Sequence, residues 1–196
     1  MKKTLTFVLP ILLLAGCMSV PSKRYFQILI LDTDGPPVPT IEKTLYLEPV
    51  RVDPLYDDTR IVYRVTPFEI QYYSYGYWAK RPDALFREAM ADFFVKRNAF
   101  RRVTLDVLRG DPEILLRSSI RILEEIDNPN VWYGRLAMTL EFLDFKSGRS
   151  LLVINFDRKM QLLEKQVRAL PAALSRILEE ELVRATVELA RVLDGK

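Results

Sequence analysis

The side chains that could perform acid–base chemistry in this sequence are carboxylates, because the chain contains no histidine. They gather in two clusters, one at Glu124, Glu125 and Asp127 and one at residues 179–181. Two carboxylates can act as general acid and base. However, the first cluster closes a predicted strand and the second lies on the polar side of a predicted helix. We therefore interpret both clusters as solvated charged faces, and we expect Glu179→Ala to be nearly neutral for stability.

Other catalytic and binding machinery lacks the residues it needs. Without histidine there is no Ser-His-Asp or Cys-His arrangement and no imidazole metal ligand. A single cysteine cannot form an internal disulfide or a CxxC site, and the sequence has neither a Gly-Lys-Ser/Thr phosphate loop nor a Gly-x-Ser-x-Gly elbow. A net charge of +3 over 196 residues is too dilute for a nucleic-acid binder. We predict a non-enzymatic protein with no cofactor, no metal site and no nucleic-acid partner.

The only cysteine, Cys17, ends an N-terminal targeting segment. Met1-Lys2-Lys3 is followed by an apolar run from Thr4 to Leu14. That run is too short for a membrane-spanning helix, which needs about 20 residues, so it reads as the apolar core of a signal peptide. The ending Leu-Ala-Gly-Cys resembles a bacterial lipobox, in which the cysteine thiol receives a diacylglycerol. The alternative is an ordinary secretory signal that happens to precede a buried cysteine.

These features predict a signal peptide at residues 1–16, a lipidated N-terminus and short tether at 17–24, and a domain at 25–194. Only Met18 to Lys23 separate the anchor from the first predicted strand, a reach of at most about 20 Å. In enterobacterial sorting, an aspartate after the lipidated cysteine retains a lipoprotein in the inner membrane. Here Met18 follows, so we expect the periplasmic leaflet of the outer membrane.

Five aromatic residues lie close together at Tyr72, Tyr73, Tyr75, Tyr77 and Trp78. One interpretation is an aromatic strand whose rings pack onto the sheet and the first helix. The other is an exposed contact surface, because tyrosine and tryptophan are enriched at interfaces. Alternation places Tyr73, Tyr75 and Tyr77 on one face, which is our candidate partner surface.

The first half of the domain predicts short strands and one helix. Residues 32–44, with three prolines and a glycine, predict a loop. Leucines, phenylalanines and a methionine at helical spacing predict a helix from Pro82 to about Asn98. The predicted strands are Tyr25–Leu31, Leu45–Val52 with Pro49 at an edge or bulge, a hairpin of Arg60–Val65 and Phe68–Tyr77, and Phe100–Val107.

The second half is more regular. Three alternating runs predict an antiparallel meander with one buried face. A long amphipathic helix from Pro171 to about Leu193 follows, with a stripe that we expect to cover the meander. The apolar faces of the three runs are Ile114, Leu116, Ser118, Ile120, Ile122 and Ile126, then Trp132, Leu136, Met138, Leu140 and Phe142, then Leu152, Ile154, Phe156, Met160 and Leu162. The fold class expected is α+β: one domain in which an antiparallel or mixed sheet with a long hairpin meander is covered by two helices.

The order of several motifs resembles the ABC-type transport auxiliary lipoproteins. After the lipobox come LYLEPVRVDPLYDDTRIVYR (residues 45–64), Trp78-Ala79 before Pro82, FLDFKSGRS (142–150) and ALPAALSRILEEEL in the last helix. Family members often have arginine where Tyr77 stands. The resemblance implies an α/β sandwich without catalytic residues, working with an ATPase, a permease and a mammalian-cell-entry-domain protein. It implies movement of phospholipid or other hydrophobic molecules between membranes.

Two function classes remain open from the sequence. The first is a docking component of such a transporter. The second is an outer-membrane lipoprotein for envelope assembly or cell-wall contact, independent of any ABC system; an anchored hydrolase using carboxylates is a distant third. The sequence also leaves open whether the protein forms a homo-oligomer.

Overall fold

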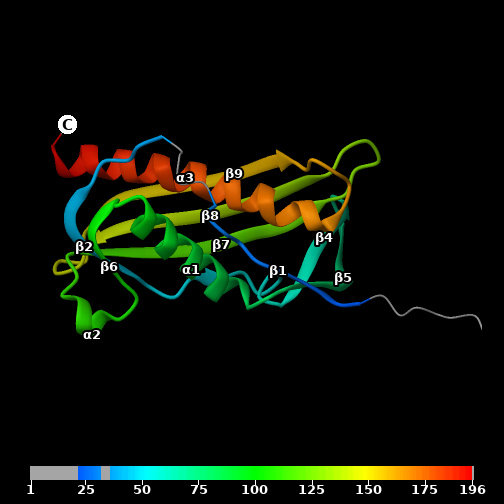
Figure 1. The fold of residues 1–196 in the computed structure, drawn as a ribbon, viewed down its shortest axis with the longest axis horizontal. Coiled ribbons are helices and arrows are strands. Elements are labelled where there is room, and N and C mark those ends of the chain that lie inside the picture. Colours follow the sequence, from blue (N-terminus) through cyan, green and yellow to red (C-terminus); the bar gives the residue numbers. More distant parts are fainter. Residues whose placement is uncertain (1–21, 32–35, 196) are drawn as a thin grey trace, which may run out of the picture.

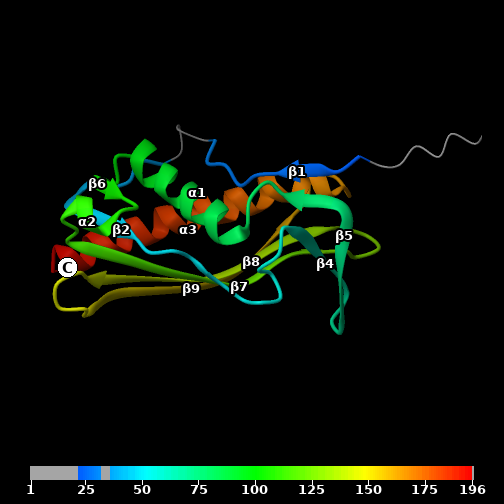
Figure 2. The ribbon, with the colours of Figure 1, turned by 90° about the horizontal axis from the view of Figure 1, so that it is seen from below.

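The computed structural model describes residues 22–31 and 36–195, which form an open sheet with two long helices on one face (Figures 1 and 2). The predicted signal peptide, the lipidation site Cys17 and the sorting residue Met18 lie outside the described residues. In chain order the elements are β1 (Arg24–Phe26), β2 (Ile41–Leu47), β3 (Arg51–Val52), β4 (Arg60–Thr66), β5 (Glu69–Trp78), α1 (Pro82–Lys96), β6 (Phe100–Thr104), α2 (Val107–Gly110), β7 (Ile114–Ile126), β8 (Tyr133–Asp144), β9 (Ser150–Gln161), the 3₁₀ turn η1 (Val167–Ala169) and α3 (Leu170–Leu193).

Strand β7 joins the two halves of the sheet. On one edge it pairs antiparallel with β8, which pairs antiparallel with β9, so the predicted meander is confirmed. On the other edge β7 pairs parallel with β2, β3 and β4 in turn. The predicted hairpin is confirmed as β4–β5, and the parallel pairs β2–β6 and β1–β5 complete a mixed sheet.

Helices α1 and α3 cover the same face of the sheet, as Figure 2 shows. Proline suits the start of α1 at Pro82, because the first N–H of a helix has no intrahelical acceptor, and Asp83 suits the positive end of the dipole. The predicted stripe of α3 is confirmed. Its members are all buried: Leu174, Leu178, Leu182, Ala185 and Leu189.

A β-bulge in β7 overturns part of the predicted alternation. Ile120 lies opposite Met138, but Ile122 lies opposite Ala137, so Arg121 is an extra residue. After the bulge, the odd-numbered residues of β7 point to the face of the sheet that the even-numbered residues occupy before it. Glu125 therefore lies on the helix-covered face, where alternation predicted Ile122 and Ile126.

The position of Glu125 follows from its partner across the ladder. Glu125 lies opposite Gly134 on β8. A Cβ added at Gly134 would lie 3.0 Å from Leu170 Cδ1 and 3.3 Å from Ala173 Cβ of α3. Directly opposed residues share a face, so Glu125 points toward the start of α3.

Several predicted strand limits are wrong. The strand predicted at Tyr25–Leu31 ends at Phe26, because the residues after it have no strand neighbour. The predicted loop at 32–44 contains the start of β2, since Ile41 pairs with β6.

Two further strands are shorter than predicted. The strand predicted at Leu45–Val52 is divided around Pro49, which has no N–H for the ladder, into β2 and β3. The strand predicted at Phe100–Val107 ends at Thr104, where Asp106 caps the short helix α2.

The fold class predicted from the sequence is confirmed as a single α+β domain in which two helices cover a mixed sheet. No helix within residues 22–31 and 36–195 is long and apolar enough to cross a membrane.

Candidate functional site

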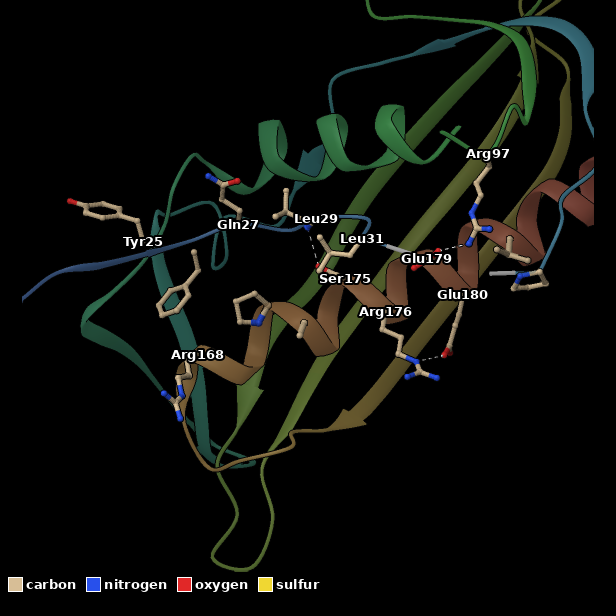
Figure 3. Close-up of a pocket in the computed structure, with 15 residues that line it drawn as sticks. Tyr25, Gln27, Leu29, Leu31, Arg97, Arg168, Ser175, Arg176, Glu179 and Glu180 are labelled. Atoms are coloured by element: carbon tan, nitrogen blue, oxygen red, sulfur yellow. Dashed lines mark hydrogen bonds and ion pairs between the residues drawn. The ribbon is translucent and has the colours of Figure 1, made fainter. Parts of the chain in front are cut away.

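A hollow on the described surface lies between the segment Gln27–Leu31 and the first half of α3 (Figure 3). Burial alternates along this segment: Ile28 and Ile30 are buried, whereas Leu29 and Leu31 are exposed. The segment is held by side chains rather than by a neighbouring strand. The backbone N–H of Leu29 donates to Ser175 Oγ at 3.1 Å, and Lys96 Nζ donates to the carbonyl of Ile30 at 3.1 Å. We call this hollow the α3 groove.

The α3 groove has a volume of about 860 Å³ and a wall made of both apolar and charged side chains. Apolar side chains come from both sides of the groove: Leu29, Leu31 and Pro36 from the N-terminal segment, and Pro171, Ala172 and Val183 from α3. Pockets of this size and composition commonly hold apolar ligands or side chains of a partner. The groove contains no nucleophile paired with a base.

Charged side chains of the groove are neutralised in pairs. Arg97 forms an ion pair with Glu179 at 2.7 Å, and both side chains are largely buried, at 5% and 16% exposure. Arg176 pairs with Glu180 at 3.2 Å in an exposed position, which contributes little to stability. Glu179 is therefore not on the solvated side of the helix as predicted, and it holds a buried guanidinium.

Glu124 is a buried carboxylate with a full set of hydrogen bonds. The guanidinium of Arg64 donates to its two oxygens at 2.9 and 2.8 Å, and Tyr56 Oη donates to Oε2 at 2.8 Å. Arg135 lies 3.5 Å from Oε1 and also binds Asp157. Burial and the neighbouring carboxylate raise the pKa of Tyr56 to about 12. This cluster ties β4, β7 and β8 together beneath the loop that follows β3.

Glu125 is equally buried, but its carboxylate has few hydrogen bonds. Its Oε1 accepts a hydrogen bond from Tyr73 Oη at 2.6 Å, whereas its Oε2 has no hydrogen-bond partner among the described residues. Burial raises the pKa of Glu125 to about 7, with Tyr73 lowering it and Asp127 raising it. Burial and the same carboxylate raise the pKa of Tyr73.

The interpretation of the acidic clusters as solvated faces is wrong for four of their members. Glu124 and Glu125 are fully buried, Glu179 pairs with Arg97, and Glu181 is 3% exposed and bound by Arg158 and Arg184. For Glu124, the signal in the sequence was the supply of arginines on neighbouring strands, Arg64 and Arg135. The bulge that turns Glu125 inward has no sequence signature that we could use.

The three tyrosines of the candidate partner surface occupy different environments. Tyr75 is 42% exposed. Tyr73 is half-buried by its contact with Glu125, and Tyr77 packs against Tyr25 with ring centroids 5.8 Å apart. A second hollow of about 430 Å³ lies beside Tyr73 and Tyr75. The register shift between β4 and β5 breaks the alternation that predicted a common face.

The buried carboxylates of the described residues have structural partners. The buried carboxylates bind arginines and tyrosines, and no group of histidine, cysteine, aspartate and glutamate within residues 22–31 and 36–195 could hold a metal ion.

Comparison with known proteins gives a family match and similar structures. A family model described as ABC-type transport auxiliary lipoprotein component matches residues 31–185. The structure of protein XCC0632 from Xanthomonas campestris, of the DUF330 family, has a TM-score of 0.73 at 17% identity and covers 88% of this chain and 96% of its own. A structure described only as an uncharacterized protein has a TM-score of 0.70 at 14% identity, covering 86% of this chain and 99% of its own.

The hypothetical protein CT253 from Chlamydia trachomatis has a TM-score of 0.51 at 10% identity, covering 76% of this chain and 98% of its own. At these identities the structural similarities support the fold alone. No curated protein is significantly similar in sequence.

Proposed function

The chain belongs to the ABC-type transport auxiliary lipoprotein family, and from that premise we propose that it is a membrane-anchored docking component of an envelope transporter. Its partners would be the ATPase, the permease and a mammalian-cell-entry-domain protein of the same system. The cargo would be phospholipid or another hydrophobic molecule that moves between membranes. The protein itself would catalyse no reaction.

The observation that carries this proposal is the extent of the family match. Residues 31–185 include every strand from β2 onward and most of α3, so the match covers all of the described fold except β1 and the end of α3. The character of the described surface is consistent with docking. The α3 groove combines apolar side chains from two segments with paired charged side chains.

The anchor would be Cys17, followed by a short tether. Four residues separate Cys17 from Ser22, the first described residue, and the distance between the two is at most about 18 Å when the chain is extended. Acyl chains contribute about 0.8 kcal/mol per buried CH₂, so two or three chains on one cysteine hold a protein on a membrane stably. Met18 after the anchor favours the outer membrane.

Two surfaces could contact partners. The α3 groove offers apolar walls, and the exposed ring of Tyr75 offers an aromatic contact beside the start of β1. Tyr73 and Tyr77 are part of the same proposal, but their packing makes serine substitutions there a test of folding as well as of binding. Tyr75→Ser is therefore the informative single variant.

The test is purification of the lipidated protein from membranes in mild detergent, followed by mass spectrometry of the proteins recovered with it. We expect the ATPase, permease and mammalian-cell-entry-domain proteins encoded beside its gene. Recovery of none of them would contradict the proposal. Recovery of envelope-assembly or cell-wall proteins in their place would favour an outer-membrane lipoprotein independent of an ABC system.

A further inference from the structure

The buried carboxylate of Glu125 is only partly hydrogen-bonded. Its Oε1 accepts from Tyr73 Oη at 2.6 Å, whereas its Oε2 has no hydrogen-bond partner among the described residues. Such an atom requires an explanation, because a buried carboxylate is stable in its ionised form only when hydrogen bonds and countercharges replace water. The surroundings of Glu125 therefore favour the protonated acid, and burial raises its pKa to about 7.

The elements packed around Glu125 supply no countercharge. Its ladder neighbours are Tyr63 on β4 and Gly134 on β8, and Gly134 faces the apolar start of α3. The charged side chains on these elements and beside them are bound elsewhere or carry the same sign as an ionised Glu125: Arg64 and Arg135 (with Glu124), Arg168 (with Glu164) and Asp127. An ionised Glu125 therefore gains stability only if water reaches it.

The part of β5 that carries Tyr73 is out of register with β4. Four residues of β5, 73–76, lie between paired positions that a single residue, Ile61, separates on β4. A bulge of this kind bends a strand, and Figure 2 shows the bend in β5. Because no position on β4 pairs with residues 73–75, the hydrogen bond from Tyr73 to Glu125 connects this bulge to the centre of the sheet.

The second hollow, of about 430 Å³, lies against the same bulge and has room for several water molecules. Tyr63, Tyr73, Tyr75 and Gly76 line it, and Glu125 does not. The Tyr73 side chain therefore lies between the hollow and Glu125, since it lines the first and its hydroxyl binds the second. Movement of this one side chain would let water from the hollow reach the carboxylate, with both long helices left in place.

We propose that the Tyr73–Glu125 contact is a pH-sensitive switch: it is closed when Glu125 is protonated, and ionisation of Glu125 opens the bulge at residues 73–76 to water. In the open state the carboxylate is hydrated and ionises at its ordinary pKa of 4.5, whereas in the closed state its pKa is about 7. Between these pH values opening releases a proton, so the open population rises with pH and is constant above about pH 7.5. The shape of the tyrosine surface thereby depends on pH, and this inference does not depend on the proposed function.

The test is hydrogen–deuterium exchange of the full chain in mild detergent at pH 5, 6, 7 and 8, read by mass spectrometry and corrected for the intrinsic pH dependence of exchange. Protection of residues 73–76 in the unaltered protein is expected to fall by at least about tenfold between pH 5 and pH 7 and to level off above that. Glu125→Gln has no ionisable group at this position and is expected to keep its pH 5 protection at every pH. Glu69→Gln, an exposed position on the same strand, is the matched control and is expected to show the fall of the unaltered protein.

Two further measurements separate this opening from global unfolding. A local opening exposes little surface, so dilute urea at constant pH should change the protection of residues 73–76 much less than that of the amides in β8. Tyr73→Phe keeps the ring and removes the hydroxyl, so its protection at pH 5 should already be lower than that of the unaltered protein.

PH-independent protection of residues 73–76 in the unaltered protein overturns the proposal, as does the same fall in Glu125→Gln or its loss in Glu69→Gln. A urea dependence equal to that of β8 also overturns it, because the opening would then be global. Equal protection of Tyr73→Phe and the unaltered protein at pH 5 overturns the role of the hydrogen bond. If Glu125→Gln does not fold, the pH profile of the unaltered protein and the comparison with Tyr73→Phe decide.

Discussion

Glu124 and Glu125 are neighbours in the chain, both are fully buried, and their environments are opposite. Glu124 binds two arginines and a tyrosine, so its negative charge is compensated. Glu125 has one tyrosine and one unpartnered oxygen, so its charge is not compensated. Removing the charge at the two positions should therefore have opposite effects on stability.

Glu125→Gln should remove a pH dependence of stability. The pKa of Glu125 rises from 4.5 to about 7 on folding, so between those pH values the folded chain holds a proton that the unfolded chain has lost. The free energy of unfolding therefore falls as pH rises through this window, by about 3 kcal/mol in total. Urea unfolding at pH 4.5, 6 and 8 should show this fall for the unaltered protein relative to Glu125→Gln, which should be the more stable at pH 8. Parallel pH profiles would contradict a buried, uncompensated carboxylate.

Glu124→Gln should destabilise the protein at neutral pH. It leaves the guanidinium groups of Arg64 and Arg135 without their shared carboxylate in a buried position, which costs about 3–5 kcal/mol. Urea unfolding at the same pH values measures the loss in the free energy of unfolding. A loss below about 1 kcal/mol would show that solvent reaches this cluster.

At the scale of elements, α3 is the largest cover of the meander, and its central leucines are fully buried. Leu178→Ala should reduce the free energy of unfolding by about 2–5 kcal/mol, as truncation of a buried leucine does. Arg191→Ala, an exposed position on the same helix, should change it by less than about 0.5 kcal/mol. Chemical denaturation of the domain from Ser22 compares the two. Equal small losses would mean that α3 is not packed as the structure describes.

The elements with strong periodicity could be predicted from the sequence. The meander, the β4–β5 hairpin and both long helices follow from apolar spacing and from turn residues, because these patterns report burial on one face. The failures are local. The bulge at Arg121 adds one residue and exchanges the faces beyond it, and the segment Gln27–Leu31 alternates like a strand although helices hold it. Contacts with residues distant in sequence decide both the bulge in β7 and the conformation of Gln27–Leu31, so neither could be predicted from local patterns.

The candidate site was harder to predict than the fold. A groove between an N-terminal segment and a C-terminal helix joins residues about 145 positions apart, as the contact of Leu29 with Ser175 shows. No local motif marks it. Tyr73, Tyr75 and Tyr77 were identified by residue type, and their partner-binding role stays a prediction. They do not form one exposed face, because Tyr73 contacts Glu125 and Tyr77 packs against Tyr25.

At the scale of the whole molecule, the proposed anchor at Cys17 would hold the domain at a membrane surface. Cys17→Ser should abolish acylation and leave protein that is uncleaved or released from membranes. Intact-mass spectrometry should show a mature N-terminus at Cys17 with acyl chains in the unaltered protein. Unaltered protein that remains in the soluble fraction with an unmodified cysteine would contradict the lipoprotein assignment of this chain.

The central claim is that this protein is a component of a transport complex, and the composition of the purified particle tests it most directly. Native mass spectrometry of the lipidated protein, released from membranes in mild detergent, gives that composition in one measurement. The account predicts a particle whose mass includes this chain together with the permease, the ATPase and the mammalian-cell-entry-domain protein. Particles containing only copies of this chain would contradict it.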